Sequence, residues 1–370
     1  GIASQKPELR AKFPGVPEDA VNYLLAIAND VREILSKIGV KSIDDIIGRT
    51  DLLKVKSNLD FQKTKNINLD RLLADPDPSN TKPRKKILDR NDRDENPIDY
   101  EIMNICRLSI DELERKSINL SIKNTDRTVG AILSGTIAKK YGNKGLPDET
   151  IRINFRGTAG QSFGGYLING ISLFLEGEAN DYVGKSMHGG KIIVYPDRES
   201  NYLTEGNSII GNTVLYGATA GRLYAAGFAG ERFCVRNSGV VAVVEGVGDH
   251  ACEYMTGGEV YIFGPVGKNL GAGMSGGLAY ILVENENINH QINHDMVLVE
   301  KVNTKDIAKI KFSLNEHYVL TKSKKAKLIL DGFDDFVPRF IKIVPKELFK
   351  LLESKGIDID DFDFVNPKLN

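Results

Sequence analysis

One short phrase recurs between residues 157 and 277 of this chain: a methionine, any residue and two glycines, followed by an apolar run. It begins at Met187, Met255 and Met274, and the runs read Lys-Ile-Ile-Val, Glu-Val-Tyr-Ile and Leu-Ala-Tyr-Ile. Glycine reaches backbone angles that residues with a Cβ reach only at a cost, so a Gly-Gly pair before such a run indicates a tight corner leading into a strand. The region is therefore predicted to consist of short strands that each begin at a glycine corner.

The glycines recur with a nearly constant period. Gly190, Gly211, Gly230 and Gly248 are 21, 19 and 18 residues apart, and Gly258 is again 19 residues from Gly277. A period near twenty residues with no helical pattern inside it is typical of a β-solenoid. We predict a mainly β fold, a right-handed parallel β-helix whose strands stack at about 4.8 Å and enclose an apolar column. The predicted strands are residues 191–195, 213–216, 222–225, 232–235, 240–244, 259–263 and 278–283, and the alternating run from Ile151 begins the coil.

Length and charge limit the remaining choices. With 370 residues the chain is expected to contain two or more structural units, and a net charge of -1 gives no electrostatic case for nucleic acid or a membrane surface. No run approaches the roughly 20 apolar residues that cross a bilayer. Cys106, Cys234 and Cys252 are widely spaced, which suits a reducing compartment and offers no CxxC metal pair. The N-terminus lacks an initiator Met and a signal-peptide pattern, so we expect it to begin inside a larger domain.

Helical patterns flank the repeats. Apolar residues recur at helical spacing over Pro17–Ile38, which begins with Pro and is followed by Gly39. A shorter helix is predicted over residues 42–47, with Ser42 and Asp45 as a near capping box. Both helices need another body to cover their apolar faces. Further on we predict a strand over residues 117–123, a helix over 127–141 capped by Thr125 or Asp126, and an amphipathic helix over 345–354.

A polar, proline-punctuated stretch over residues 58–97 is predicted to be a connector on the surface. Its basic cluster, residues 84–86, is followed by an acidic run at 92–95 that cancels most of its field. We therefore interpret the stretch as a solvated linker and not as a nucleic-acid patch.

Short motifs with a chemical meaning have simpler structural explanations. Residues 271–276 match GxGxxG, but a dinucleotide site needs a helix after the motif, and the next residues are strand-like. His290 and His294, beside Asp295, have the spacing of a metal pair on a helix, yet the segment is a poor helix former and favours a polar loop. His188 and His250 are predicted to be exposed turn residues without a neighbouring nucleophile. Cys234 and Cys252 are interpreted as small buried thiols.

A carbohydrate-active solenoid remains an alternative, because such enzymes use clustered carboxylates on one face. Cleavage of a glycosidic bond needs two carboxylates about 5–9 Å apart, and nothing in the sequence places two of the charged residues so. These residues fall mostly at corners: Asp181, Lys185, Arg222, Glu231, Arg232, Arg236, Asp249 and Lys268. The sequence assigns no catalytic, cofactor-binding or metal-binding residue to this chain.

Longer stretches carry a family resemblance. The segments from Gly157, Leu175, Gly211 and Glu231 resemble the C-terminal GXGXG domain of the glutamate synthase large subunit, as does Asn124-Thr-Asp-Arg-Thr-Val-Gly-Ala before the repeats. The tail at residues 336–342 is similar to that family as well. Residues 1–10 and 47–53 resemble the last part of the family's flavin-binding TIM-barrel synthase domain, just after the cysteines of its iron–sulfur cluster. The resemblance spans nearly the whole chain except the stretch near residues 58–95.

The resemblance implies four segments. Residues 1–57 would be the end of the synthase domain, 58–98 a linker, 99–320 the GXGXG β-helix domain, and 321–370 a tail with one helix. The complete enzyme would make two glutamates from glutamine and 2-oxoglutarate, in ammonia assimilation. It would use FMN and a 3Fe-4S cluster, which this chain is not expected to hold, because the barrel and cluster cysteines lie upstream in the family. The implied partners are the amidotransferase and synthase domains and an electron donor, a donor subunit or ferredoxin, in the cytoplasm or the plastid stroma.

The predicted role of this chain is therefore that of a structural spacer, inactive alone, between amidotransferase and synthase domains. One alternative is a free-standing β-helix subunit that docks on a separate flavoprotein through the apolar stripe of residues 21–38. The other alternative is the carbohydrate-active β-helix enzyme. The sequence leaves open whether ferredoxin or a nicotinamide nucleotide supplies the electrons.

Overall fold

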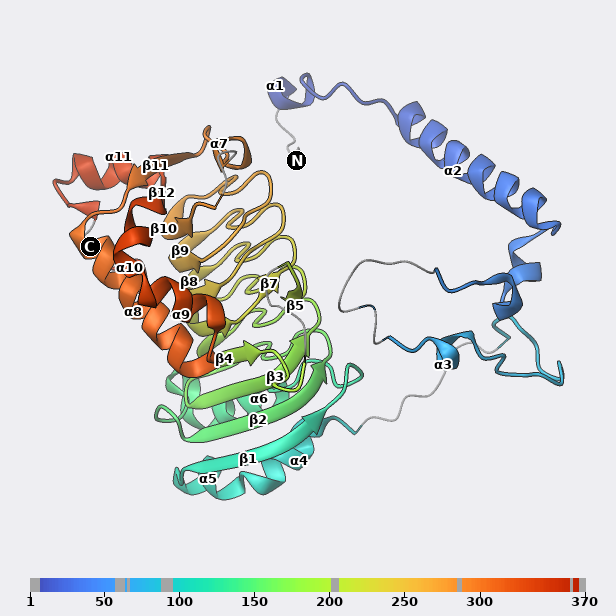
Figure 1. Ribbon diagram of the computed structural model, residues 1–370, viewed down its shortest axis with the longest axis horizontal. Coiled ribbons are helices and arrows are strands. Elements are labelled where there is room, and N and C mark those ends of the chain that lie inside the picture. Colours follow the sequence, from blue (N-terminus) through green and yellow to red (C-terminus); the bar gives the residue numbers. More distant parts are fainter. Residues whose placement is uncertain are drawn as a thin grey trace. The chain divides into compact units, whose positions relative to one another are not determined.

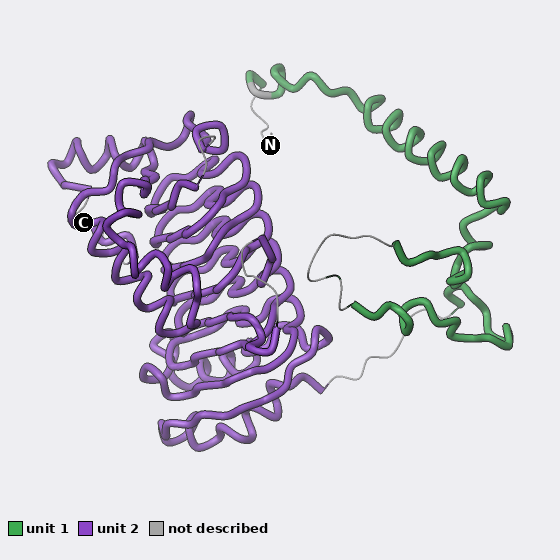
Figure 2. The backbone as a smooth tube through the Cα atoms, viewed as in Figure 1, with its two compact units in different colours: residues 1–94 green, residues 95–370 purple. Residues whose placement is uncertain are grey.

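The computed structural model describes residues 7–56, 64, 67–87, 96–200, 206–284, 288–359 and 362–365. The chain divides into two compact units, residues 1–94 and residues 95–370, drawn in different colours in Figure 2. The first unit is helical, whereas the second contains a large sheet and nearly all of the buried residues.

The first unit confirms the long predicted helix. Pro17 begins α2, and Gly39 ends it with a left-handed φ of 80°. The second predicted helix is only a single 3-10 turn, in which Asp45 Oδ2 accepts the N–H of Ser42 at 2.9 Å. The helices and 3-10 turns of this unit (Figure 1) are α1 (Pro7–Arg10), α2 (Pro17–Ile38), Ile43–Ile46, Thr50–Leu52 and α3 (Asp70–Leu73).

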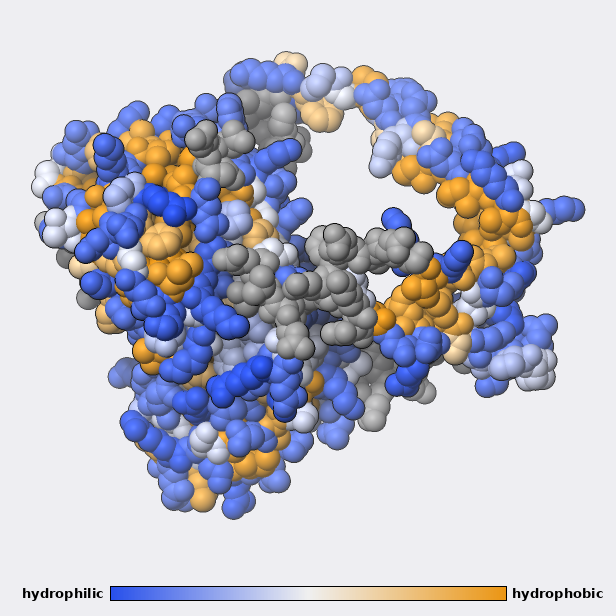
Figure 3. Space-filling model, viewed as in Figure 1, coloured by the Kyte–Doolittle hydropathy of each residue, from blue (hydrophilic) through white to orange (hydrophobic). Residues whose placement is uncertain are grey.

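This first unit has almost no core of its own. Among its described residues Leu35 alone is buried. The apolar side of α2 is open to solvent, with Tyr23 and Leu24 68% and 65% exposed. Figure 3 shows hydrophobic residues along this helix. Exposure of such an apolar face to water is unfavourable in free energy. The face therefore needs to be covered by protein that the described residues of this unit do not supply.

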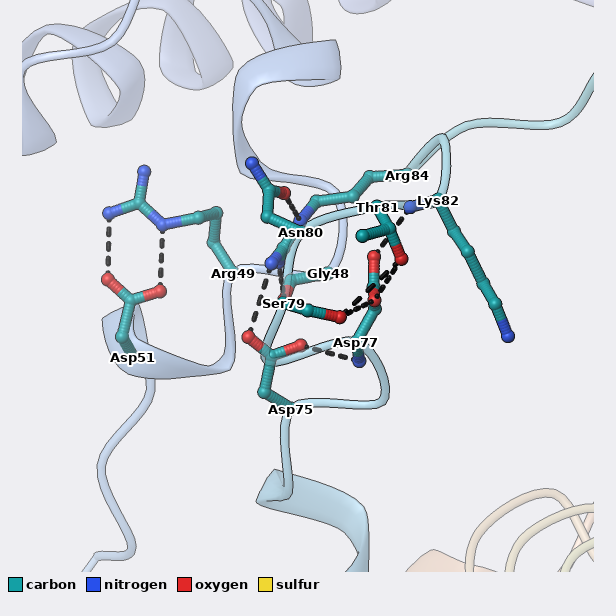
Figure 4. Close-up of polar contacts among 10 residues, drawn as sticks. All are labelled: Gly48, Arg49, Asp51, Asp75, Asp77, Ser79, Asn80, Thr81, Lys82 and Arg84. Carbon is teal, nitrogen blue, oxygen red and sulfur yellow. Dashed lines mark hydrogen bonds and ion pairs between the residues drawn. The ribbon is translucent and has the colours of Figure 1, made fainter.

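The described part of the polar connector is held in an ordered loop (Figure 4). Arg84 donates from Nη1 to the Gly48 carbonyl at 2.8 Å and from Nη2 to Asp75 Oδ2 at 3.1 Å. Asp77 accepts the backbone N–H of Lys82 at 2.7 Å, and this bond is the leading cause of the lowered pKa of Asp77. Arg84 therefore serves to tie two segments 36 residues apart and not to form a basic patch.

The second unit is built on one twelve-stranded, mostly parallel sheet (Figure 1). The strands β1, β2, β3, β4, β6, β8, β9 and β10 are parallel neighbours in chain order, β12 and β11 extend the sheet with antiparallel pairs, and β5 and β7 branch from β3. Their bounds are β1 (Lys116–Ile122), β2 (Ile151–Ala159), β3 (Ile171–Ala179), β4 (His188–Tyr195), β5 (Ser208–Ile210), β6 (Ala220–Ala225), β7 (Phe228–Ala229), β8 (Ser238–Val244), β9 (Thr256–Ile262), β10 (Gly276–Leu282), β11 (Val297–Lys301) and β12 (Phe340–Pro345).

Most predicted strands are confirmed, and the glycine corners have a defined form. β1, β2, β4, β6, β8, β9 and β10 contain or nearly match the predicted runs, whereas β3, β5, β7, β11 and β12 were not predicted. Each Gly-Gly pair lies inside the first residues of its strand, where the pairing register shifts, as between His188 and Lys191. Gly190 and Gly258 have φ of 74° and 87° there. The predicted corner is therefore a β-bulge.

Two predicted strands, residues 213–216 and 232–235, are wrong. These segments are turns in which every second residue has a left-handed backbone, as at Thr213 (φ 59°) and Leu215 (φ 60°). They still pair with their neighbours: the Thr213 N–H donates to Glu231 O and the Leu215 N–H to Val183 O, both at 2.8 Å. Equivalent left-handed segments occur at residues 162–166, 182–186, 232–236, 250–254 and 269–273. The sequence was strand-like because both segments contain short apolar runs, Val214–Leu215 and Phe233–Val235, which are buried although the backbone is not extended.

Two apolar clusters lie on opposite faces of the sheet. One holds the inward column of consecutive strands, whose register runs through Ile153, Leu173, Ile192, Leu223, Ala242, Val260 and Ala279. The other lies under helices, where Tyr224, Tyr261 and Tyr280 meet Ile310 and Leu314 of α8. Because large side chains occupy both faces, the sheet is covered on each of them.

The helices of the second unit make the fold mixed α/β and not mainly β. Of these helices, only those over residues 127–141 and 345–354 were predicted. Figure 1 shows α8 and α9 lying across the strands β4 to β10. The helices are α4 (Ile98–Ile105), α5 (Arg107–Glu112), α6 (Ala131–Tyr141), α7 (Ile288–Gln291), α8 (Thr304–Thr321), α9 (Lys324–Asp331), α10 (Phe333–Phe336) and α11 (Lys346–Ser354).

The predicted cap of α6 is wrong. The helix begins after Gly130, and neither Thr125 nor Asp126 caps it. The capping oxygens come from Asp99 on α4, which accepts the backbone N–H groups of Gly130, Ile132 and Leu133 at 2.8, 2.8 and 3.1 Å. Burial raises the pKa of Asp99, and these three bonds oppose the rise. A long-range cap of this kind leaves no local sequence signal.

Candidate functional site

A groove of about 820 Å³ lies between the sheet and α8 in the second unit. Its floor comes from the first halves of β4, β6, β8 and β9, and its wall from Ala308, Lys309, Phe312 and Ser313 of α8. Gly190 and Gly221 lie along the floor, together with the side chains of Lys191 and Arg222.

Charged side chains cross the floor in one row. Register pairs Lys191 with Arg222, Arg222 with Val241 and Val241 with Glu259 on successive strands. In a parallel sheet such residues lie side by side on one face, because their strands are in register. Arg222 lies within β6, as the predicted strand over residues 222–225 implied, and the structure places it in this groove.

Each charge of the row has a partner. Lys191 Nζ lies 2.9 Å from Asp148 Oδ2 and 2.9 Å from Glu149 Oε1. Arg222 Nη1 donates to Glu316 Oε2 of α8 at 2.6 Å, and the Tyr224 hydroxyl donates to the same oxygen at 2.6 Å. Burial first, and then the bond to Glu316, raise the pKa of Tyr224. The Tyr224 hydroxyl thus remains a neutral donor.

The far end of the row is built in the same way. Lys309 Nζ of α8 lies 2.7 Å from Glu259 Oε1, and the Tyr261 hydroxyl donates to Glu259 Oε2 at 2.8 Å. Burial first, and then the Glu259 charge, raise the pKa of Tyr261. Both oxygens of Glu259 are thereby engaged, Oε1 with Lys309 of α8 and Oε2 with Tyr261 of the same strand. Such an arrangement orients a helix but supplies neither an activated nucleophile nor a free base.

Deeper polar contacts hold the same helices. Glu245 Oε1 accepts a short hydrogen bond from Ser323, the residue that caps α9, and lies 3.1 Å from His317 Nε2 of α8. His317 is fully buried between Tyr224 and Phe263. No substrate reaches this cluster, because all its groups are covered by the helices. Sequence reasoning missed it, since Glu245 and Ser323 are 78 residues apart.

A second buried pair lies further along α8. Lys342 Nζ of β12 lies 3.0 Å from Asp306 Oδ2, and both side chains are 2% exposed. The Tyr280 hydroxyl donates to Asp306 Oδ1 at 2.8 Å. Burial first, and then the Asp306 charge, raise the pKa of Tyr280. These bonds join the first turn of α8 to β10 and β12.

The histidines singled out by the sequence lie in different places. His188 begins β4 and is exposed, with Nδ1 2.6 Å from the Thr219 hydroxyl. His250 is half-buried, and its Nδ1 lies 3.2 Å from Glu253 Oε1. His290 lies in α7, a four-residue helix that the sequence did not predict, and His294 lies beyond that helix. The structure therefore does not place the pair on one helix face. Residues 271–276 lead into β10, as expected for corner glycines.

The corner charges proposed for a carbohydrate-active enzyme act on the backbone. Asp181 Oδ1 accepts the N–H of Asn212 at 2.8 Å, and Asp249 Oδ1 accepts the N–H of Lys268 at 2.7 Å. Arg232 Nη2 lies 3.3 Å from the nearly buried Glu253. Asp181 and Asp249 thus each bond to the backbone of a later segment of the chain. Lys185 and Arg236 lie on left-handed segments, and Glu231 directly precedes one.

The cysteines do not fit an iron–sulfur cluster. Cys106, Cys234 and Cys252 are free and buried, and burial raises the pKa of each thiol, that of Cys252 to about 12. A cysteine that binds an iron–sulfur cluster must be a thiolate, whereas these three buried thiols resist losing their proton. Within the part of the chain that the structure describes, no group of three or more His, Cys, Asp or Glu is suited to hold a metal ion. No described helix is long and apolar enough to cross a membrane.

Comparison with known proteins identifies the class. Residues 99–346 match the family described by the GXGXG motif, and because this match covers more than half of the chain, the protein belongs to that family. Its relatives are glutamate synthases. It is 47% identical over 350 residues to ferredoxin-dependent glutamate synthase 2 of Synechocystis, across 93% of this chain and 22% of that protein.

Two further relatives agree. The chain is 44% identical over 360 residues to the large chain of the NADPH glutamate synthase of Bacillus subtilis, across 96% of this chain and 23% of that protein. It is 44% identical over 362 residues to the NADH glutamate synthase of Schizosaccharomyces pombe, across 96% of this chain and 17% of that protein. The chain therefore spans about a fifth of the length of the curated relatives it matches.

Proposed function

We propose that this chain is the C-terminal part of a glutamate synthase large subunit and that its sheet is a rigid spacer between amidotransferase and synthase domains. The single observation that carries the spacer role is the state of the groove: its charged residues are all engaged in ion pairs. Arg222 and Glu259 pair with Glu316 and Lys309 of α8, and Lys191 pairs with Asp148 and Glu149 before β2. Polar groups used in this way stabilise one geometry instead of turning over a substrate. We further propose that the complete enzyme makes glutamate from glutamine and 2-oxoglutarate.

We infer that the parallel strands and left-handed segments form a right-handed β-solenoid. Parallel pairs join β1, β2, β3, β4, β6, β8, β9 and β10 in this order, with a register shift at the glycine bulges. Backbone bonds between successive left-handed segments, such as Arg232 N–H to Asp249 O at 2.8 Å, add a second ladder. A coil bonded along two ladders resists bending, which suits a spacer.

We assign residues 1–57 to the end of the flavin-binding domain, 58–98 to a linker, 99–320 to the β-helix and 321–370 to the tail. The open apolar side of α2 supports the first assignment, since a fragment of a domain exposes what the rest of that domain would cover. FMN and the 3Fe-4S cluster of the complete enzyme would then be held outside this chain, with an electron-donor subunit or ferredoxin as partner. We propose a location in the cytoplasm or the plastid stroma; the plastid is consistent with the Arabidopsis relative, whose name places it in chloroplasts and mitochondria.

The test uses the complete large subunit. Gly258→Val should distort the coil, because φ is +87° and a Cβ would lie 2.4 Å from Val240 O. Gly217→Ala is the milder variant, with a left-handed φ of 65° and open space near the Cβ. We expect more glutamine hydrolysed per glutamate formed, with free ammonia in solution, in Gly258→Val and to a smaller degree in Gly217→Ala. Unchanged coupling in variants that remain folded by circular dichroism would contradict the spacer role.

A second candidate is a free-standing subunit that docks on a separate flavoprotein. The exposed Tyr23 and Leu24 of α2 are as consistent with this candidate as with the first, because either the rest of the synthase domain or a separate flavoprotein would cover them. The mass of the protein purified from its native source separates the two: about 41 kDa with a co-purifying flavoprotein would support docking, given the 40.8 kDa of this chain. A polypeptide several times heavier would support the first proposal.

A further inference from the structure

Tyrosines and cationic residues alternate across five consecutive left-handed segments, one residue on each. We name these residues the aromatic–cation row: Tyr166, Lys185, Tyr216, Arg236 and Tyr254. Backbone bonds between segments show that they are neighbours. The Tyr166 N–H donates to Lys185 O at 2.8 Å, and the Ser186 N–H donates to Tyr216 O at 2.8 Å. The Arg236 N–H donates to Glu253 O, beside Tyr254, at 2.9 Å. The row therefore crosses five turns of the chain.

The two cations of the row are held by tyrosine rings. The Arg236 guanidinium lies 5.5 Å from the centre of the Tyr216 ring, and its Nη1 lies 3.2 Å from the Tyr216 hydroxyl. Lys185 Nζ lies 5.5 Å from the centre of the Tyr182 ring. Among the residues that the structure describes, neither cation forms an ion pair. Rings orient a cation without neutralising it, so both charges remain available to an external carboxylate.

The backbone of the row is strained where its side chains are exposed. Tyr166, Arg236 and Tyr254 have φ of 60°, 56° and 55°, and the equivalent position of neighbouring segments is Gly217 or Gly273. Glycine meets this conformation at lower cost. Tyr166 and Tyr254 are 54% and 51% exposed, so the packing of their rings within the unit offsets little of the backbone strain. A strained, exposed aromatic residue indicates a role outside the isolated unit.

We propose that the aromatic–cation row is an interface for a carboxylate-bearing surface in the remainder of the large subunit. Tyrosine and arginine are the residue types enriched at the centres of protein interfaces, and the row joins them to uncompensated positive charge. The remainder is the chosen occupant because this chain spans only 22% of the Synechocystis relative. The inference rests on the proposed function, since it needs a longer polypeptide.

One variant separates an interface from a structural role. Tyr166→Gly relieves the strain at φ 60°, so the 370-residue chain should unfold at an unchanged or higher urea concentration. In the complete large subunit the same variant should loosen the interface, seen as faster amide hydrogen exchange at residues 182–186 and 213–217. A lower unfolding midpoint, or exchange that Tyr166→Gly leaves unchanged, would overturn the proposal.

The occupant is identified by photo-crosslinking. In the complete large subunit, p-benzoylphenylalanine replaces Tyr166 or Tyr254, and the control position is Phe312, a 57% exposed residue of α8. We expect crosslinks from the row to peptides upstream of Gly1 that are rich in Asp and Glu. Lys185→Glu with Arg236→Glu should reduce their yield by about tenfold or more. Crosslinks only to a second copy, only within residues 95–370, or none would overturn the proposal. The proposed function is tested separately by the intact mass of the native protein. It fails if this chain is not part of a longer polypeptide.

Discussion

His317 on α8 places Nε2 3.1 Å from Oε1 of Glu245, the residue that follows β8. Both side chains are almost inaccessible, at 0% and 2% exposed. Since the same carboxylate also accepts from Ser323 at the start of α9, one buried group holds two helices on the sheet. Much of the second unit's helical layer depends on this contact.

Glu245→Ala is therefore expected to destabilise the chain strongly. It leaves the buried His317 and Ser323 without their shared acceptor, and breaking a buried polar pair costs about 3–5 kcal/mol. Urea unfolding of the 370-residue chain measures the loss. The control is Glu353→Ala on the exposed side of α11, which should change stability by less than about 0.5 kcal/mol. Equal effects of the two substitutions would show that the cluster adds no stability.

Alkaline pH should weaken the fold through the buried thiols. The pKa of Cys252 is raised to about 12 in the folded chain, from an ordinary value of 9.0. Between these values the unfolded thiol has lost its proton while the folded one keeps it, so unfolding releases a proton and stability falls as pH rises above 9.0. Urea midpoints from pH 8 to 10.5 should decline less in Cys252→Ala than in the parent. At pH 8, iodoacetamide should label Cys252 only after unfolding.

Two glycine-to-alanine substitutions should act in opposite directions. Gly177 has φ +145°, and a Cβ there would lie 1.8 Å from Gly157 O, so Gly177→Ala should cost at least about 2 kcal/mol. Gly135 lies in α6 with open space around it, so Gly135→Ala should stabilise the chain by about 0.5–1 kcal/mol. Thermal unfolding followed by circular dichroism compares them. A loss of stability in Gly135→Ala would contradict the described helix.

The left-handed segments allow a direct test of their backbone. Thr213 is β-branched and has φ 59°, so Thr213→Gly should stabilise the chain by about 1 kcal/mol. Thr256 is an exposed residue of β9 without a left-handed φ, so Thr256→Gly should lower stability by about 0.5–1 kcal/mol. Chemical unfolding of both variants is the measurement. If Thr213→Gly also lowers stability, the segment is an extended strand, as its sequence first indicated.

Sequence periodicity predicted the stacked parallel strands because each element is specified by its own residues. The Gly-Gly pairs need left-handed or bulged backbone wherever they occur, and the apolar run after Met255 reads as a strand without knowledge of its neighbours. The same holds for α2, whose start at Pro17 and end at Gly39 are local signals. Predicting the left-handed segments failed, because their short buried apolar runs resemble those of a strand.

By itself, then, the sequence determined the repeat, the parallel rungs, the long first helix and the family. Only the tertiary structure decided that Asp99 caps α6, that α8 and α9 cover the sheet, and that Lys191 and Arg222 are neutralised by Asp148 and Glu316. The physical reason is range. Backbone preferences act over a few residues, whereas a buried ion pair or a distant cap forms between residues that come together only when the whole chain has folded.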